Sequence, residues 1–294
     1  MQDLRDRAAV VTGAGGGIGL GIARALAGAG VDVVVADIEA DAAEAAARDL
    51  ASTGVRTLAC SCDVSDRSDV EALAERAWTA FGRIDILVNN AGVFPPIARL
   101  VDALEQDVRW VLDVNVMGVW NGCSVFGRRF VDQGSPAHIV NTGSENSLGM
   151  AHTGAAAYTA SKHAVLGLSD VLRHELPDHI GVSIVCPGMV ATRLGTATRN
   201  RPARFGGPVE PVGPPGPGLG MDPDEVGRLT VEGVRRGDFY IVTHPPVREI
   251  VQERCAEILG AFDAHAPRFD GDDRLDTRAI MRRMRESRRS GPEE

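Results

Sequence analysis

Two side chains capable of acid–base chemistry stand four residues apart in the sequence, Tyr158 and Lys162. Lys162 is the only lysine among the 31 lysine and arginine residues, so this position requires an amine where arginine serves elsewhere. On a helix, residues i and i+4 share a face, which brings the phenol and the ammonium to one pocket. An adjacent cation favours the phenolate and lowers a tyrosine pKa from its ordinary value near ~10. We therefore predict that Lys162 turns Tyr158 into a general acid or base.

Further polar residues fall where predicted strands end. Ser144 follows an apolar run that ends at Thr142, and Asn89 and Gly92 mark the end of an earlier run. Parallel sheets bind ligands at the carboxyl edge of their strands, so a hydroxyl at Ser144 is placed to hold a substrate oxygen. Asn115 lies inside a predicted long helix, where an amide is unfavourable unless it is used. A helix–helix hydrogen bond and a place in a proton relay are both open for it.

A glycine-rich turn, TGAGGGIG at residues 12–19, follows the first apolar run and precedes a helical pattern. This arrangement presents free backbone N–H groups and the positive end of a helix dipole to a phosphate. Asp37 ends the second apolar run, where a carboxylate accepts hydrogen bonds from adenosine ribose hydroxyls and repels a 2′-phosphate. We therefore expect a dinucleotide site that takes NAD in preference to NADP. The alternative for Asp37 is an acid that only caps the next helix.

Short β-rich apolar runs alternate with longer amphipathic stretches from Ala8 to about Phe262, which is typical of consecutive βαβ units. Most of the runs are continuously apolar, as expected when helices cover both faces of a parallel sheet. We predict an α/β fold with a doubly wound, parallel, seven-stranded Rossmann sheet and helices on both faces. The predicted strands are 8–12, 31–37, 55–62, 84–89, 137–142, 182–186 and 239–243, and the predicted helices are 18–29, 39–52, 66–81, 102–130, 155–176 and 223–236.

Two segments depart from this alternation. Glycine and proline fill most positions from Gly206 to Gly220, a composition that excludes a regular element. We predict a flap over a ligand site at about 193–222, with an interdomain linker as the alternative. Residues 265–294 are predicted to form a charged tail with a short helix at 277–288, the alternative being a subunit-contact arm. Residues 1–264 are then a single domain for dinucleotide binding and catalysis.

The composition excludes several classes of function. The chain of 294 residues is 44% hydrophobic and 24% charged, with a formal net charge of -9, so we expect a globular protein that binds neither nucleic acid nor an anionic membrane surface. No signal peptide or membrane-spanning run is recognisable, which predicts no membrane association. The five cysteines have neither disulfide nor metal-ligand spacing, which predicts a cytoplasmic location and no metal site.

Together these motifs resemble the short-chain dehydrogenase/reductase family in its compact single-domain form. The glycine turn is similar to the family's TGxxxGIG turn, and residues 89–92 are similar to its NNAG motif. The resemblance implies a catalytic tetrad of Asn115, Ser144, Tyr158 and Lys162. It also implies cofactor contacts from Gly13, Gly15, Gly17, Ile18, Gly19, Asp37, Asp63, Val64, Asn89, Ala91, Gly92, Tyr158, Lys162, Pro187, Gly188, Val190 and Thr192, the last four matching a PGxxxT segment.

The reaction implied by the resemblance is the NAD-dependent interconversion of a secondary alcohol and a ketone. Tyr158 would exchange the hydroxyl proton and Ser144 would hold the substrate oxygen. Lys162 would lower the tyrosine pKa, hold the nicotinamide ribose and connect through a water chain to Asn115. Ser144 lies 14 residues before Tyr158, slightly farther than is usual in the family, so Ser147 is a rival for its role.

The substrate pocket is expected to be apolar, which favours a hydrophobic or cyclic alcohol of steroid or terpenoid type. Glu145 and His152 lie near the predicted pocket mouth and are expected to be solvated loop residues, with substrate contact as the alternative. The apolar residues expected at the pocket are Phe94, Pro95, Pro96, Ile97, Met150 and Leu194.

The sequence leaves two other functions open, and the resemblance implies an oligomeric state. A non-catalytic dinucleotide-binding redox sensor would keep the fold and lose the chemistry, and an epimerase or dehydratase would use the same fold on a nucleotide sugar. The resemblance further implies a homotetramer, in which the long helices at 102–130 and 155–176 pair between subunits.

Overall fold

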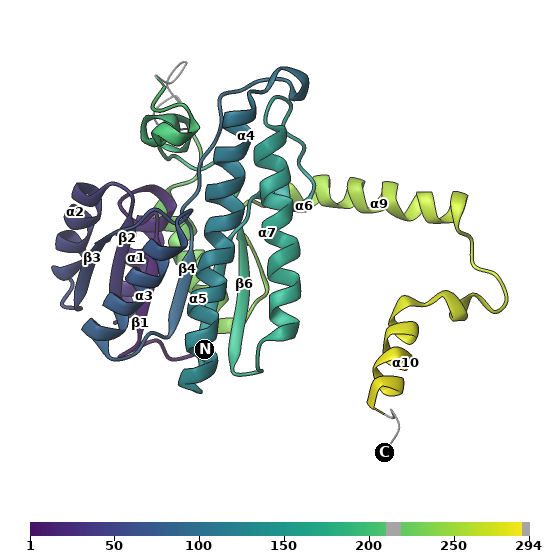
Figure 1. Ribbon diagram of the computed structural model, residues 1–294, viewed down its shortest axis with the longest axis horizontal. Helices are drawn as coiled ribbons and strands as arrows, with labels where there is room; N and C mark the ends of the chain where they lie inside the picture. Colours follow the sequence, from purple (N-terminus) through teal and green to yellow (C-terminus); the bar gives the residue numbers. More distant parts are fainter. Residues whose placement is uncertain (210–218, 290–294) are drawn as a thin grey trace. The chain divides into compact units, whose positions relative to one another are not determined.

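The computed structural model describes residues 1–209 and 219–289, and the chain divides into two compact units, Met1–Arg248 and Glu249–Glu294. The first unit is built on a seven-stranded sheet in the order β3-β2-β1-β4-β5-β6-β7 (Figure 1). All neighbouring strands are parallel, which confirms the predicted doubly wound Rossmann sheet. The strands are β1 (Ala8–Thr12), β2 (Asp32–Asp37), β3 (Thr57–Ser61), β4 (Ile86–Asn89), β5 (Ala137–Thr142), β6 (Ile180–Cys186) and β7 (Tyr240–Val242).

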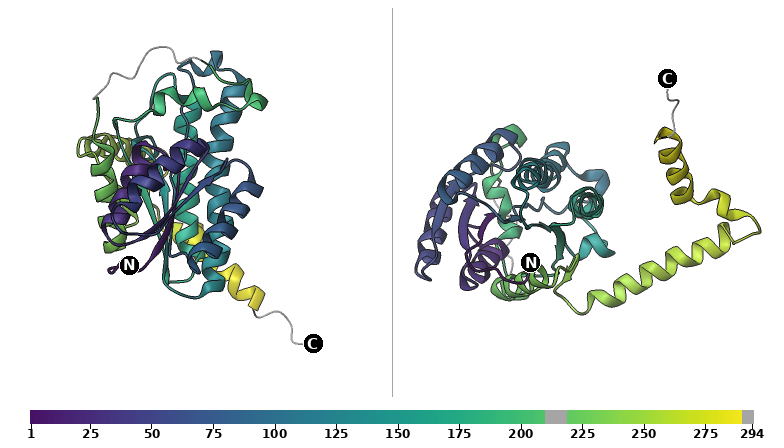
Figure 2. Two further views of the ribbon diagram at one scale, coloured as in Figure 1. Left: turned by 90° about the vertical axis from the view of Figure 1, so that its left-hand side faces the viewer. Right: turned by 90° about the horizontal axis from the view of Figure 1, so that it is seen from below.

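Helices cover both faces of the sheet and form a separate hydrophobic core on each (Figure 2). Side chains of β1 alternate between the two cores, with Val10 in one and Ala9 and Val11 in the other. This explains why the strands read as continuous apolar runs. One core is closed by α1 (Gly17–Gly28), α2 (Ala40–Ala51) and α8 (Pro223–Arg236), and the other by α3 (Arg67–Phe81), α5 (Gly118–Gln133) and α7 (Ala156–Glu175).

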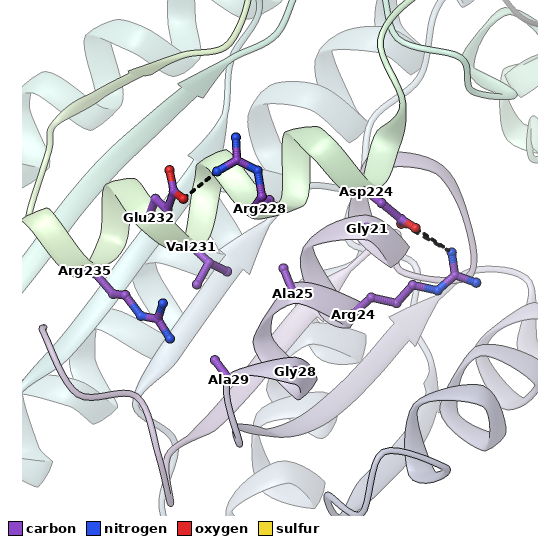
Figure 3. Close-up of a pocket in the computed structure, with 10 residues that line it drawn as sticks. All are labelled: Gly21, Arg24, Ala25, Gly28, Ala29, Asp224, Arg228, Val231, Glu232 and Arg235. Atoms are coloured by element: carbon purple, nitrogen blue, oxygen red, sulfur yellow. Dashed lines mark hydrogen bonds and ion pairs between the residues drawn. The ribbon is translucent and has the colours of Figure 1, made fainter.

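Helices α1 and α8 cross at glycines. A Cβ atom on Gly21 would lie only 2.2 Å from the carbonyl oxygen of Pro223, so a larger residue would force the helices apart. A cavity of about 360 Å³ lies between these helices, where Arg24 pairs with Asp224 and Arg228 with a glutamate (Figure 3). No residue of the predicted site lines this cavity.

The predicted continuous helix at 102–130 is wrong. The chain instead forms a short 3-10 turn at Leu100–Asp102, then α4 (Glu105–Leu112), a π-helical turn at Asp113–Met117, and α5. Single π turns inside helices are frequent at functional sites, because the extra residue re-aims the side chains around it. Asn115 lies in this turn.

The described part of the predicted flap is packed against the rest of the first unit. It contains two 3-10 helices, Leu194–Asn200 and Ala203–Phe205, and Val190 forms a β-bridge with Met221. Phe205 is buried against Trp110 of α4. The predicted loop at 206–220 falls partly on residues 210–218, which lie outside the described residues.

The second unit begins at Glu249, earlier than the boundary after residue 264 that the sequence predicts. The difference arises from α9 (Val247–His265), a helix that the sequence prediction omits and whose side chains beyond Val247 are mostly exposed. Downstream, a 3-10 turn at Asp272–Leu275 precedes α10 (Thr277–Arg289), where the sequence predicts a short helix. Among the described residues, no helix combines the length and apolar character that crossing a bilayer requires.

Candidate active site

The glycine turn between β1 and α1 has positions that only glycine can occupy. Gly13 has a φ of +62°, and a Cβ there would lie 2.8 Å from Cα of Ala91. A Cβ on Gly19 would lie 2.2 Å from the carbonyl oxygen of Gly13. Glycine at these positions therefore lets the turn pack tightly against the end of β4 and lead into the N-terminus of α1, where a helix end attracts a phosphate.

Thr12 and Asn90 join this turn to the end of β4. The Thr12 hydroxyl accepts hydrogen bonds from the backbone N–H groups of Asn90 (3.0 Å) and Ala91 (3.1 Å). The side chain of Asn90 donates to the carbonyl oxygen of Thr12 at 2.9 Å. Both residues lie inside recognised motifs, but sequence reasoning did not single them out, because their partners become neighbours only when β1 pairs with β4.

Asp37 is held at the edge of the glycine turn. One carboxylate oxygen accepts a hydrogen bond from the Gly15 N–H at 2.8 Å, and the other accepts one from the Glu39 N–H at 3.0 Å. Each ionised oxygen keeps capacity for another donor. The carboxylate thus has free acceptor capacity at the edge of the glycine turn.

Other predicted cofactor residues lie at the carboxyl ends of neighbouring strands or at the start of α1. Thr192 packs against the glycine turn, since its γ-methyl lies 3.1 Å from the position that a Cβ of Gly17 would occupy. Asp63 pairs with Arg204 of the flap at 2.9 Å, and buried Val64 packs against Gly118. The remaining predicted contacts are Ile18 at the start of α1, Gly92 after β4, and Pro187, Gly188 and Val190 after β6.

Asn89, a predicted cofactor contact, makes its side-chain hydrogen bonds inside the protein. Its side chain is 4% exposed and donates a hydrogen bond to the side-chain oxygen of Asn141 at 2.9 Å. It also approaches the thiol of Cys123 at 3.4 Å. The amide therefore links β4 to β5 inside the protein, and only the backbone of Asn89 remains for a cofactor contact.

Tyr158 and Lys162 lie one turn apart on α7, and both are buried. The Lys162 ammonium donates a hydrogen bond to the carbonyl oxygen of Thr142 at 2.8 Å. It lies 5.6 Å from the centroid of the Tyr158 ring. The ring of Phe94 covers Tyr158, with 4.8 Å between ring centroids. The helix thus brings phenol and amine to one pocket, at the carboxyl end of β5.

The predicted lowering of the Tyr158 pKa by Lys162 is not what the structure gives. Burial raises the pKa of Tyr158 to about 12, against the lowering effect of a hydrogen bond with Ser144, and the charge of Glu145 raises it further. Burial also lowers the pKa of Lys162 to about 8. Removal from water disfavours the charged form of each group and is the largest cause of both shifts.

Ser144 and Ser147 make different hydrogen bonds. Ser144 is the N-cap of a short helix, α6 (Glu145–Leu148), and its hydroxyl donates to the side-chain oxygen of Asn146 at 3.0 Å. The Ser147 hydroxyl accepts a hydrogen bond from the Ser144 N–H at 3.1 Å and donates to the carbonyl oxygen of Lys162 at 2.7 Å. Ser144 therefore interacts with Tyr158, whereas Ser147 joins the serine loop to α7.

Asn115 supports the loop that follows β4. Its side-chain oxygen accepts from the Val93 N–H at 2.8 Å, and its amide donates to the Val93 carbonyl at 3.0 Å and to the Ser161 hydroxyl at 3.1 Å. Gly92 lies between Asn115 and the Lys162 ammonium, because a Cβ there would be 3.4 Å from the amide oxygen and 3.7 Å from Nζ. Asn115 and Lys162 thus approach the same point without a direct hydrogen bond.

Glu145 is not the solvated loop residue that the sequence predicts. It begins α6, and its side chain is only 14% exposed. His152 lies at the limit of ion-pair distance, with 4.0 Å between Nε2 and Oε1. Helix α6 follows a buried strand directly, which is why its first side chain lies inside the pocket rather than on the surface.

Comparisons with known proteins agree with this geometry. Residues 7–203 match the sequence model of a family described as short chain dehydrogenase. The C alpha-dehydrogenase of Sphingobium sp. (strain NBRC 103272 / SYK-6) is 32% identical over 278 residues, which cover 91% of this chain and 89% of that protein. A 1-deoxy-11-beta-hydroxypentalenate dehydrogenase of Streptomyces arenae is 40% identical over 194 residues, covering 64% of this chain and 68% of that protein. A short chain dehydrogenase/reductase from Burkholderia phymatum, solved in complex with NAD, has a TM-score of 0.81 at 34% identity and covers 88% of this chain and 96% of that chain.

Proposed function

Because the chain belongs to the short-chain dehydrogenase/reductase family of oxidoreductases, we propose that it interconverts a secondary alcohol and a ketone, with Tyr158 as general acid and base. The observation that carries this proposal is the buried group formed by Tyr158, Ser144 and Lys162 at the carboxyl end of β5. A buried phenol next to a hydroxyl and an amine supplies the proton transfer that a carbinol needs.

The residues that follow β1 and β2 suit a dinucleotide. Gly13 and Gly19 let the turn pack tightly at the N-terminus of α1, and the Asp37 carboxylate accepts a hydrogen bond from the turn. A nicotinamide dinucleotide held there would supply the hydride acceptor for the carbinol carbon. The placement of Asp37 supports NAD over NADP, since an added phosphate would face a carboxylate.

Each residue of the site has a defined task in this scheme. Tyr158 takes the hydroxyl proton during oxidation and returns it during reduction. The backbone N–H of Ser144 is held by Ser147, and its hydroxyl would turn from Asn146 to donate to the oxygen that gains charge. Lys162 uses one N–H on the carbonyl of Thr142 and keeps two donors for ribose hydroxyls. Asn115 fixes the loop at Gly92 past which a water chain to Lys162 would run.

The pocket supports a hydrophobic or cyclic substrate. The ring of Phe94 covers Tyr158 and offers an apolar wall next to the reacting atoms. Among the relatives, one is named for its action on a hydroxypentalenate, and the other is named a C alpha-dehydrogenase.

The test is a panel of secondary alcohols and matching ketones, followed by the absorbance of NADH or NADPH. We expect NAD-linked oxidation of at least one apolar alcohol, with NADP supporting a slower reaction. Failure of every alcohol and ketone, together with tight NADH binding, would favour the redox sensor, and turnover of a nucleotide sugar without net cofactor reduction would favour the epimerase.

A further inference from the structure

Glu145 follows Ser144 in the chain, and its carboxylate accepts no hydrogen bond from the described part of the protein. Its backbone is fully engaged, since the N–H donates to the carbonyl of Pro187 at 2.8 Å and its carbonyl accepts from Gly149 at 3.2 Å. Within residues 1–209 and 219–289, no donor lies within hydrogen-bond distance of the carboxylate, which is 14% exposed. Neither carboxylate oxygen is among the buried polar atoms without a partner, so both reach solvent and can accept a hydrogen bond from a bound molecule.

The neighbouring side chains already have other partners. Nδ1 of His244 accepts from the Gly188 N–H at 3.0 Å, and its Nε2 lies 2.9 Å from the carbonyl oxygen of Met189. The Lys162 ammonium points to Thr142. His152 is the remaining candidate, and its 4.0 Å separation from Glu145 is longer than a hydrogen bond. The carboxylate therefore remains free to accept a hydrogen bond from water or from a bound substrate.

The carboxylate lies next to the reacting centre. Glu145 follows Ser144 in the chain, and its Oε2 lies 2.8 Å from where a Cβ of Gly188 would be. Its charge also acts on the phenol of Tyr158. A substrate oxygen held between Ser144 and Tyr158 would thus have the carboxylate near the substituent on its carbinol carbon, while Phe94 offers only an apolar wall.

We propose that Glu145 is a specificity residue that selects alcohols with a hydrogen-bond donor, a hydroxyl or an ammonium group, on the carbon next to the carbinol. The inference rests on the proposed function, because it takes the substrate oxygen to be held by Ser144 and Tyr158. A carboxylate at the same place in the substrate, as in a 2-hydroxy acid, is rejected by like charge. A charged partner makes the hydrogen bond stronger than a neutral one, so the ammonium is preferred over the hydroxyl.

The experiment uses the full chain and four probes that differ only in the group beside the carbinol. These are 1-phenylethanol, 1-phenyl-1,2-ethanediol, 2-amino-1-phenylethanol and mandelate. Ratios of kcat/KM are measured with NAD, and the affinity of each probe for the protein saturated with NADH is measured by calorimetry. Glu145→Gln is the test variant, and Glu44→Gln, on the exposed face of α2, is the matched control.

We expect the wild-type protein and Glu44→Gln to prefer the amino alcohol and the diol over 1-phenylethanol by about tenfold or more, and to discriminate against mandelate. In Glu145→Gln, the preference for the ammonium group should be lost. Its kcat/KM for mandelate should rise by at least about tenfold relative to that for the amino alcohol.

The same ratios in wild type and Glu145→Gln would overturn the inference while leaving the dehydrogenase assignment in place. Weaker NADH binding in Glu145→Gln with unchanged ratios would also overturn it, since the cofactor would then be the donor. A binding preference that Glu145→Gln abolishes, without turnover of any probe, would support the inference and contradict the proposed reaction.

Discussion

Burial shifts the pKa of Tyr158 and that of Lys162 in opposite directions and away from one another, to about 12 and about 8. The pocket therefore favours the neutral phenol and disfavours the charged amine, because both ionic forms have lost their water. A neutral phenol is ready to donate its proton to a ketone, whereas oxidation of an alcohol requires that the phenol first lose its proton.

The first prediction at this scale is a pH dependence that differs between the two directions. A raised pKa keeps Tyr158 protonated, so alcohol oxidation should increase steadily from about pH 7 to about pH 10, while ketone reduction stays nearly flat over that range. The measurement is kcat in both directions across pH, with recovery of activity at neutral pH as the check on stability. An oxidation rate that reaches its plateau below about pH 7 would show that the phenol is far more acidic than its burial implies.

The two serines of the pocket provide a second prediction. Ser144→Ala removes the hydroxyl that interacts with Tyr158, so kcat should fall by about a hundredfold or more with little change in NADH affinity. Ser147→Ala removes a support that acts through the Ser144 N–H and the Lys162 carbonyl, and its loss should be smaller and accompanied by lower thermal stability. Equal losses of kcat in the two variants, with unchanged stability, would contradict the separate tasks assigned to them.

Sequence reasoning located most of these residues because they follow strand ends in recognisable motifs. It could not give the pKa of Tyr158, since a four-residue spacing carries no information on burial. It also placed Glu145 in solvent, because nothing in the sequence shows that α6 begins inside the pocket. Thr12 and Asn90 escaped notice for a related reason: their hydrogen bonds depend on the pairing of β1 with β4.

At the scale of elements, the π-helical turn between α4 and α5 determines where Asn115 points. The uninterrupted helical pattern at 102–130 conceals this turn, because inserting one residue into a helical turn leaves the apolar periodicity almost unchanged. Helix α4 in turn holds the flap. Arg201 of the flap and Asp107 of α4 form an ion pair with side chains that are 3% and 10% exposed.

This ion pair supplies the prediction for the flap. Asp107→Asn leaves a buried guanidinium without its counter-charge, which should lower the free energy of unfolding by about 3 kcal/mol and expose the flap to proteolysis. The measurement is urea unfolding together with limited proteolysis. Replacing both residues by apolar ones, Asp107→Leu with Arg201→Met, should restore most of the loss. A single variant as stable as wild type would mean that the pair does not anchor the flap.

At the scale of the whole molecule, the alternation of apolar runs and amphipathic stretches was sufficient to predict the parallel sheet. Strands β1, β2, β4, β5 and β6 are buried on both faces, and this makes their sequences largely apolar. The extent of the first unit was harder to predict. Residues 249–265 have enough apolar content to resemble a buried helix, yet Leu259 and Phe262 are 65% and 58% exposed in α9. Composition alone does not show which helices find a packing partner.

The assembly is the prediction that belongs to this scale. Trp120 on α5 and Val171 on α7 are 55% and 56% exposed, an unusual placement for large apolar side chains that suits pairing between subunits. We expect a homotetramer of 31.1 kDa chains, measured by size-exclusion chromatography with light scattering. Trp120→Glu combined with Val171→Glu should reduce the mass to that of a dimer or monomer. A wild-type mass of one chain would contradict the expected assembly.

The most direct test of the account is the catalytic rate of Tyr158→Phe, compared with that of Tyr240→Phe. The chain has two tyrosines, and Tyr240 on β7 is 48% exposed, so the second variant is a matched control for loss of a phenol hydroxyl. We predict that Tyr158→Phe binds NADH as wild type does and loses turnover by about a thousandfold or more, while Tyr240→Phe retains full activity. Turnover of Tyr158→Phe at the wild-type rate would contradict the central claim that this phenol moves the proton.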